Sequence, residues 1–569
     1  MKGKILKLSM IPLLALGIFG CGSDHTGSDS GDSQHNGSDT SMTQNRYDEL
    51  LSYGVTPPLP PEYYDDNVTV SQTADEILSD DTNISNLDMG LVQQLSLQPS
   101  SLLNGISWND NDMEVLPILD QPLSLLIIAD ASFMEALEPL KDHKNAINMP
   151  TALKSWQSLV QTFAAYGVDD PERLKQAIAY YKKNASINYV MLVGDSDMFP
   201  VRYCKNYATA GNYWTPTDLY YADLLKEDGS FDTWDANGNH IFCETKAVEA
   251  YPQGGLINID EIDGRMDVVV GRVPASSVSE VNNYVQKVMA YENNTTGGNW
   301  KKNALMIVPG EFSVSGDVFQ YRDSYPGSLS LKEDIAKHFE SYLLTVNRAY
   351  YTQMTLTKEE IKEQINAGVG YVNFAGHGSR NGWWLGTEDG TSLGFFDRTD
   401  IDHLSNQNRY PIVFSTACDT GKYYNNKAYR DEGNSEVMMN SALDKNPPAP
   451  NPIQPSSYDV DSMAEAFLLS HNNSGAIAFI GSTEASQRKG QTLDRYFSHV
   501  YAQKMAHTHF LGDIWKLTNY LYIDDQQVDM RREESSDWTA SNPFEHLLKY
   551  HLFGDPSLRI TVPELEPIN

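Results

Sequence analysis

The sequence predicts an α/β fold built as two successive subdomains, each with a mainly parallel sheet flanked by helices. From about residue 116 onward, short apolar runs alternate with amphipathic stretches, which is the pattern of buried strands covered by helices. The chain has 569 residues, which leaves room for two or three packed units. Hydrophobic residues make up 40% of the chain and aromatic residues 11%, so real cores can form.

The N-terminus has the pattern of an export signal. Lys2, Lys4 and Lys7 precede the apolar run Leu8–Phe19, which is too short to span a bilayer as a mature helix. The residues that follow resemble a bacterial lipobox, so we expect Cys21 to be lipidated and to begin the mature chain. Glycine after this cysteine resembles sorting to the outer membrane, facing the periplasm or the cell surface. The alternative is an ordinary secreted protein with Cys21 unmodified.

The composition also indicates where the segments of the chain begin and end. A Gly-, Ser- and Asp-rich stretch has nothing to bury and suits a flexible tether, and a weakly periodic stretch with a Pro-rich patch follows it. In order, we expect a signal peptide at 1–20, the tether at 21–45, an N-terminal wrap or pro-segment at 46–115, an N-terminal α/β subdomain at 116–295, a second, catalytic α/β subdomain at 296–562, and a tail at 563–569.

The elements of the two subdomains follow from the apolar periodicity. We predict strands at Leu123–Ala129, Tyr189–Val193, Val268–Val270, Leu305–Val308, Tyr371–Phe374, Ile412–Phe414 and Ala476–Ile480. We predict helices at Pro171–Lys183, Val278–Glu292, Ser330–Leu344, Lys358–Ala367, Ser462–His471 and Leu493–Ala506. The polar stretch Tyr291–Lys302 is predicted to join two successive sheets, and Asn446–Pro455 is a Pro-rich loop in the second subdomain.

The charge argues against a nucleic-acid partner. The formal net charge is −34, and no long cluster of lysine and arginine occurs. A protein that binds DNA or RNA needs a basic face to neutralise phosphates. We therefore expect no nucleic-acid role.

Two strand ends carry the candidate chemistry. The strand from Gly370 runs into a glycine-flanked turn that presents His377, and the strand from Pro411 ends in Cys418. Open α/β sheets place their sites at the carboxyl ends of strands, so adjacent strands would bring these side chains together. An imidazole beside a thiol removes its proton, which predicts a cysteine nucleophile with a histidine base. The amides of Gly378 and Cys418 would donate to an oxyanion.

Each of these residues also has a structural explanation. A lone Gly-His-Gly is commonly a turn, and a buried cysteine is usually an inert small hydrophobic residue. The chain has only four cysteines, Cys21, Cys204, Cys243 and Cys418, and an odd thiol in an oxidising compartment indicates reactivity. If Cys21 carries lipid, Cys204 and Cys243 are left as a disulfide and Cys418 as the remaining thiol.

The chain resembles the gingipain family of bacterial cysteine peptidases, within the caspase-like clan, from about Leu123 to Ile560. The motifs that carry the resemblance are Val193-Gly194-Asp195 with Phe199-Pro200, Thr217–Asp223, Val270–Ala275, Ala375–Ser379 with Trp383, Thr416-Ala417-Cys418, Gly481-Ser482-Thr483 and Leu552–Leu558. Each motif alone is weak, but their order is specific. The resemblance implies a caspase-like fold, His377 as base, Cys418 as nucleophile, and protein or peptide substrates. The Gln-Ala-Cys signature of caspases themselves does not occur at this cysteine.

Family members can carry an acidic residue that orients the histidine. We expect it between Glu311 and Asp323, where Glu311, Asp317 and Asp323 are the candidates. The sequence does not choose among them, and a Cys–His dyad would also suffice.

A calcium site is a further expectation. A Gly-containing loop offers alternating side-chain oxygens of the kind Ca²⁺ prefers, and similar loops in relatives look calcium-binding. The candidate ligands are Asp228, Asp232, Asp235, Asn237, Asn239 and Glu244. A solvated turn explains the pattern equally well, and the glycine is not at the position that an EF-hand requires.

The leading hypothesis is an exported, lipid-anchored cysteine endopeptidase that acts through a thioester acyl-enzyme. Its chemistry requires no cofactor, and calcium would be structural. One alternative is a non-catalytic surface-binding lipoprotein with the same fold, since fold does not guarantee activity. Another is a narrow processing or self-cleaving protease with one partner substrate.

Overall fold

The computed structural model describes residues 122–206, 213–226, 228–248, 255–258, 260–293, 299–315, 318–353, 356–388, 391–424, 461–505, 509–526, 533–535 and 543–560. The predicted signal peptide, Cys21, the tether, the N-terminal wrap, the Pro-rich loop Asn446–Pro455 and the tail lie outside these residues. Their assignments stay predictions.

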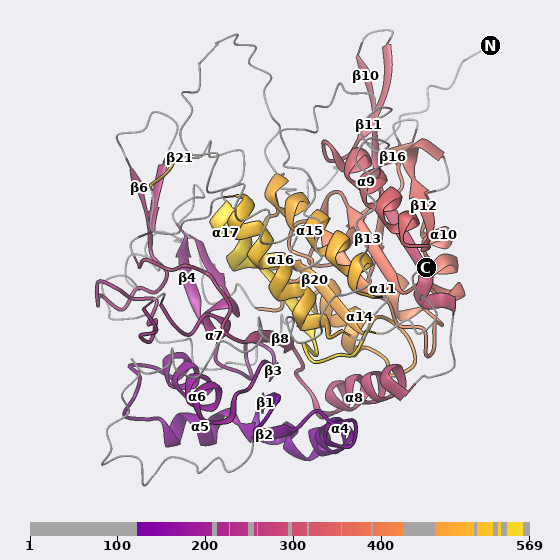
Figure 1. Ribbon diagram of the computed structural model, residues 1–569. Coiled ribbons are helices and arrows are strands. Elements are labelled where there is room, and N and C mark those ends of the chain that lie inside the picture. The colour runs from indigo at the N-terminus through magenta and orange to yellow at the C-terminus, as the bar shows by residue number, and fades with distance from the viewer. Residues whose placement is uncertain are drawn as a thin grey trace, which may run out of the picture. The chain divides into compact units, whose positions relative to one another are not determined.

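A ten-stranded sheet organises the described chain (Figure 1). Its strands, in spatial order, are β12 (Thr345–Tyr350), β9 (Asn303–Val308), β13 (Tyr371–Ala375), β19 (Ile412–Thr416), β20 (Ala478–Ser482), β22 (Tyr550–Gly554), β8 (Val269–Val273), β3 (Tyr189–Val193), β1 (Leu125–Ala129) and β2 (Thr151–Ser155). All neighbouring pairs are parallel except β20 and β22. The predicted α/β class with a mainly parallel sheet is therefore confirmed.

The two predicted sheets are joined edge to edge through one C-terminal strand. β22 pairs antiparallel with β20 over five residues and parallel with β8 at one register position, Phe553 opposite Arg272. Because β22 reverses the direction, the carboxyl ends of β1, β3 and β8 lie at the edge opposite those of β13 and β19. The sequence pattern did not indicate this link, because a run of five buried residues does not specify which strands it pairs with.

Helices cover both faces of the sheet. They are α4 (Met134–Ala146), α5 (Trp156–Thr162), α6 (Asp170–Ala185), α7 (Leu219–Ala222), α8 (Val278–Asn293), α9 (Ser328–Ser341), α10 (Lys358–Ala367), α11 (Arg398–Asp402), α14 (Met463–Leu469), α15 (Arg488–Lys504), α16 (Leu511–Asp525) and α17 (Pro543–Lys549). Figure 1 shows α15, α16 and α17, in orange and yellow, over the middle of the sheet. Asn373 of β13 contacts α9 and α15, and the next residue, Phe374, stacks on Trp383 from the other face. This alternation is the one that a strand buried on both faces requires.

Several helices begin where their sequence supplies a cap. Ser462 and Glu465 form a capping box at the start of α14, and Thr357 and Asp169 accept from the first turns of α10 and α6. Such caps satisfy amide groups that have no partner within the helix. The predicted helices therefore lie where the periodicity placed them, with ends that differ by a few residues.

Several small sheets lie outside the ten-stranded sheet. They are β10 (Gly310–Ser315) with β11 (Val318–Asp323); β14 (Gly378–Ser379) with β15 (Gly382–Trp384) and β18 (Phe395–Asp397); β16 (Thr387–Glu388) with β17 (Thr391–Ser392); β4 (Tyr203–Asn206) with β5 (Tyr213–Pro216); and β6 (Thr245–Val248) with β7 (Gly255–Asn258) and β21 (Glu533–Ser535). Short 3₁₀ turns lie at Ala131–Phe133, Asn299–Lys302 and Tyr351–Gln353. Within the described residues, no helix is both long and apolar enough to cross a bilayer.

Candidate active site

Four adjacent parallel strands bring the candidate residues to one edge of the sheet. The strand order β9-β13-β19-β20 is also the order in which the chain supplies an acid, a histidine, a cysteine and a loop beside that cysteine. Ala375 lies opposite Thr416 in the register of β13 and β19. Since His377 and Cys418 each come two residues later, the matched register presents both residues at the same level of the edge.

The histidine turn packs directly on the cysteine turn. The amide of Gly376 donates to the carbonyl of Thr416 at 3.2 Å. A Cβ atom added at Gly378 would lie 2.7 Å from the Cβ of Ala417 and 3.3 Å from the carbonyl oxygen of Cys418. Only glycine permits this approach. The turns that carry His377 and Cys418 are therefore in contact, and the catalytic pairing of the two side chains and the oxyanion role of the Gly378 and Cys418 amides stay predictions.

Cys418 lies outside the disulfide and is half-buried. The backbone amide of Ser486, which follows β20, donates to its Sγ at 3.3 Å, and Sγ lies 3.5 Å from the carbonyl oxygen of Ser486. The N–H directed at sulfur favours the thiolate, whereas the carbonyl accepts from the thiol. Ser486 is a residue that the sequence interpretation missed, because a backbone contact leaves no signature in side-chain identity.

The loop around Ser486 is held by buried neighbours. The hydroxyl of Ser486 and the phenol of Tyr550 are 2.6 Å apart, and the amide of Gln487 donates to Nε2 of His546 at 3.1 Å. Tyr550 is the first residue of β22. The C-terminal strand that joins the two halves of the sheet therefore also fixes the loop that contacts the thiol.

Among the described candidate acids, Glu311 faces the histidine. Its Oε1 lies 3.9 Å from Nε2 of His377, and its Oε2 accepts from Arg322 at 3.2 Å. Asp323 is used elsewhere, since it accepts from the hydroxyl of Tyr351 at 2.9 Å and from the amide of Leu329 at 3.1 Å. Asp317 lies outside the described residues.

Two aromatic rings border His377. Tyr325 meets it edge-on at 6.0 Å, and Trp384 lies 5.8 Å away at 54°. The amide of Trp384 also donates to the carbonyl of His377 at 3.0 Å. The imidazole is therefore restricted on two sides by rings from outside its own turn.

A buried carboxylate contacts both β13 and β19, the strands that precede His377 and Cys418. Asp494 of α15 accepts from Thr416 at 2.8 Å and from Asn373 at 2.6 Å, and it pairs with Lys332 of α9. Burial is the main cause that lowers the pKa of Lys332, and the Asp494 carboxylate counters it in part. Because Asn373 is in β13 and Thr416 in β19, one carboxylate ties both strands to the same helix pair.

Charged residues also surround the turn after the cysteine. Asp419 has a left-handed backbone with φ of 59°, and its amide donates to the carbonyl of Glu484 at 3.0 Å. Lys422 lies 3.0 Å from the carboxylate of Asp419 and 3.6 Å from that of Glu484. Burial raises the pKa of Glu484 to about 7, against the opposing effect of Lys422. Backbone strain of this kind is typical of functional turns.

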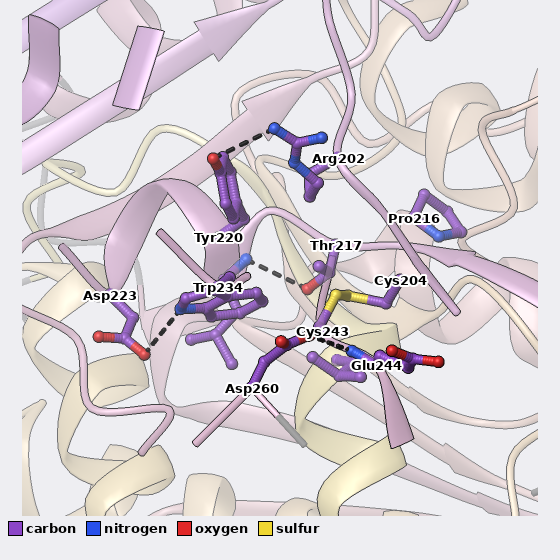
Figure 2. The surroundings of a disulfide bond; sticks show 12 residues. Arg202, Cys204, Pro216, Thr217, Tyr220, Asp223, Trp234, Cys243, Glu244 and Asp260 are labelled. Atoms are coloured by element: carbon purple, nitrogen blue, oxygen red, sulfur yellow. Dashed lines mark hydrogen bonds between the residues drawn. A yellow bond between two sulfur atoms is a disulfide. The ribbon is translucent and has the colours of Figure 1, made fainter. Parts of the chain in front are cut away.

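The structure joins Cys204 to Cys243 in a disulfide with a Cα–Cα distance of 5.1 Å (Figure 2). Figure 2 shows Trp234 beside it, donating to Asp223 at 3.2 Å. The guanidinium of Arg202 stacks 3.4 Å from the ring centre of Phe242. The disulfide therefore closes a loop of the chain between β3 and β8.

The predicted calcium loop is held by its own hydrogen bonds. Asp235 accepts from the amides of Asn239 and His240 at 2.9 and 3.0 Å, and Asn239 donates from its side chain to Glu244 at 2.9 Å. Asp228 accepts from Ser230. Within the described residues, no three acidic, histidine or cysteine side chains come together as a metal site would require. The six candidates therefore do not form one shell in this conformation.

Asp232, one of the six, instead faces a buried lysine. Lys175 is fully buried over the rings of Tyr220 and Trp234, at 4.4 and 5.1 Å. Burial lowers the pKa of Lys175 to about 8, with Asp232 and Asp223 opposing that shift. Burial likewise raises the pKa of both carboxyls.

The model of peptidase family C25 matches residues 118–561. This range covers both halves of the ten-stranded sheet and every described candidate for the active site.

Similar curated proteins are related at low identity. Gingipain R2 of Porphyromonas gingivalis is 23% identical over 325 residues, which are 57% of this chain and 35% of that protein. The chain therefore spans about a third of the length of this relative. An uncharacterized protein of Archaeoglobus fulgidus is 22% identical over 354 residues, which are 61% of this chain and 67% of that protein.

Solved structures share the fold. The crystal structure of the Arg-specific cysteine proteinase gingipain R superposes with a TM-score of 0.51 at 18% identity, covering 78% of this chain and 80% of that one. A complex of the pro- and mature domains of the same proteinase gives 0.50 at 19% identity, covering 77% and 79%. At this identity the likeness establishes the fold alone.

Proposed function

The chain belongs to peptidase family C25, and from this premise we propose that it is an exported cysteine endopeptidase with Cys418 as nucleophile and His377 as general base. The resemblance of its motifs to the gingipain family is confirmed by the family match. The observation that carries the proposal is the matched register of β13 and β19, with Gly378 packed against the Cys418 turn.

The proposed reaction begins with proton transfer. His377 accepts the proton of Cys418, and the thiolate that results is stabilised by the amide of Ser486 at 3.3 Å. Glu311 orients the imidazole through the 3.9 Å contact between its Oε1 and Nε2 of His377. Sγ then attacks the carbonyl carbon of the scissile peptide bond.

The later steps use the same residues. The amides of Gly378 and Cys418 donate to the oxyanion of the tetrahedral intermediate. His377 returns the proton to the leaving amine, which departs and leaves a thioester on Cys418. Water, deprotonated by His377, hydrolyses the thioester and restores the thiol. The chemistry uses no cofactor.

The test is cleavage of a peptide library varied on both sides of the scissile bond. We expect cleavage by the protein and none by Cys418→Ala or His377→Ala. His403→Ala is the matched control, because His403 is an exposed histidine at the end of α11 and should leave cleavage unchanged. Cleavage that persists in Cys418→Ala would contradict the proposal.

The same experiment separates the two alternatives. A narrow processing enzyme would cleave few peptides but would still react at Cys418 with peptidyl electrophiles. A non-catalytic binding protein would do neither.

Export and lipid anchoring at Cys21 are part of the proposal. They are supported by the charged and apolar N-terminal pattern and by the Cys204–Cys243 disulfide, a bond typical of oxidising compartments. Metabolic labelling with palmitate should mark the protein and not Cys21→Ala. Unlabelled protein in the membrane fraction would contradict the lipid anchor.

Calcium stays a prediction for the loop from Asp228 to Glu244. Binding would require the candidate oxygens to come together in one shell, while those of Asp235 also accept from the amides of Asn239 and His240. The thermal unfolding midpoint in calcium chloride and in EGTA tests it, and an equal midpoint in both would contradict a calcium site.

A further inference from the structure

We propose that Trp384 and Phe395, here called the aromatic platform, form a subsite for an aliphatic or aromatic side chain of the peptide substrate. The inference rests on the proposed peptidase function, which it deepens by naming a substrate class.

The platform is one face of a small sheet. In the antiparallel pairing of β15 with β18, Trp384 lies opposite Phe395 and Trp383 lies opposite Phe396. Side chains directly opposite each other share a face, and consecutive residues point to opposite faces. The sheet therefore carries two aromatic pairs, one on each face.

The two faces have different surroundings. Trp383 and Phe396 are fully buried, Trp383 stacks on Phe374 at 4.7 Å, and its Nε1 donates to Ser415 at 2.8 Å. This pair is a packing element that fixes the sheet over the ends of β13 and β19. The opposite pair is more open, since Trp384 is half-buried and the side chain of Phe395 is 40% exposed.

The exposure of Phe395 is unusual for so large an aromatic side chain. Within the described residues, the other large apolar side chains that reach such exposure are Val168, Val278 and Leu343. Single aliphatic residues at a surface are ordinary. Phe395 differs because it is an aromatic residue that lies opposite a second one, Trp384, in the pairing of β15 with β18.

The platform borders the catalytic centre. The ring of Trp384 lies 5.8 Å from that of His377, and its amide donates to the carbonyl of His377 at 3.0 Å. An extended peptide advances about 3.3–3.6 Å per residue. A substrate whose scissile bond lies at His377 therefore reaches the platform with a side chain within a few residues of that bond.

The chemistry of the surface selects the ligand class. Aromatic faces bury aliphatic and aromatic side chains with a gain roughly proportional to area, and ring pairs add a further preference for offset or edge-on contact. A cationic side chain could also lie over such rings, and the experiment distinguishes it.

The test compares single substitutions in the substrate. Peptides that differ only at one position, carrying Leu, Phe, Ser or Lys at each site from P3 to P2′, are assayed with the protein and with Phe395→Ser. At one position we expect Phe395→Ser to lower kcat/KM for the Leu and Phe peptides by about 10-fold, mainly through KM. The Ser peptide should change less than about 2-fold.

Two further variants complete the design. Phe395→Leu keeps an apolar surface and should recover much of the preference for Leu. Val278→Ser removes an exposed apolar side chain at the start of α8 and should leave every ratio unchanged. The thermal unfolding midpoint of each variant verifies that it is folded.

The remaining outcomes overturn the proposal. Equal loss on all four peptides, or no loss, would show that the platform does not select substrates. Selective loss on the Lys peptide alone would assign it to a cation. If the unchanged protein cleaves no peptide and Cys418 resists peptidyl electrophiles, the proposed function fails and the platform with it.

Discussion

At the scale of the residue, Cys418 is contacted from two neighbouring strand ends. The Gly378 turn of β13 packs against it on one side, and the amide of Ser486 after β20 donates to Sγ on the other. The first contact was predictable, because a histidine and a cysteine after two buried strands indicate adjacent strand ends. The second was not, because it depends on a backbone position set by Tyr550, which is distant in the sequence.

The first prediction concerns the acid. Glu311→Gln keeps the side-chain size and removes the charge that faces His377 at 3.9 Å, so we expect kcat to fall by about 10-fold with little change in KM. Steady-state kinetics on a cleaved peptide measures this. Asp323→Asn is the control, because Asp323 accepts from the first turn of α9. It should lower stability and leave kcat within about 2-fold. The reverse pattern would assign the orienting role to Asp323.

The second prediction concerns the support of the thiolate. Tyr550→Phe removes the partner of the Ser486 hydroxyl, so the Ser486 amide should move from Sγ and the rate of alkylation of Cys418 by iodoacetamide at pH 7 should fall several-fold. Tyr423→Phe is the matched control, since the buried hydroxyl of Tyr423 has no hydrogen-bond partner within the described residues. Equal alkylation rates in the two variants would refute the role of Tyr550.

At the scale of the element, strands were more predictable than the contacts between them. Apolar runs such as Tyr371–Phe374 are strands because both of their faces are buried. The short strands β14, β15 and β18 escaped prediction, since strands of two or three residues show no periodicity. The contacts of Asp494 could not be predicted for a different reason. It lies in a helix that was predicted, but its ties to Asn373, Thr416 and Lys332 are long-range.

The third prediction concerns the packing of α8 on α14. Lys287 is fully buried and donates only to carbonyls within the described residues, those of Phe467 at 3.0 Å and Ser474 at 3.2 Å. Burial lowers its pKa to about 7. The unfolded chain then binds the proton more tightly, with an ordinary lysine pKa of about 10.4, so stability rises with pH between about 7 and 10.4.

Urea unfolding at several pH values measures this. The free energy of unfolding of the protein relative to Lys287→Met should increase from pH 7.5 to pH 9.5. Lys337→Met, at an exposed position of α9, should show no such trend. A pH-independent difference for Lys287→Met would mean that Lys287 stays charged in the folded state.

At the scale of the whole molecule, the two halves share one sheet and differ in chemistry. The candidate catalytic residues all follow strands of the second half, and the disulfide is in the first. The fold class was predictable because alternating buried strands and helices leave few arrangements. The joining role of β22 was not, since the sequence does not specify strand order across a sheet of ten strands.

The fourth prediction separates stability from catalysis. Cys204 and Cys243 are 39 residues apart, and closing a loop of this length stabilises a domain by about 3–4 kcal/mol in the chain-entropy account. The double variant Cys204→Ser with Cys243→Ser should lose about that much unfolding free energy in urea, while its kcat at 25 °C stays within about 2-fold. A large loss of kcat in folded protein would link the disulfide to the active site.

The central claim is that His377 activates Cys418, and its most direct measurement is the alkylation rate of this one thiol. Iodoacetamide is applied at pH 7 to the folded protein, to His377→Ala and to the protein unfolded in urea, and modification of Cys418 is followed by peptide mapping. We predict that the folded protein reacts at least about 10-fold faster than the other two, because a neighbouring imidazole increases the thiolate fraction. Equal rates in the folded protein and in His377→Ala would contradict the account.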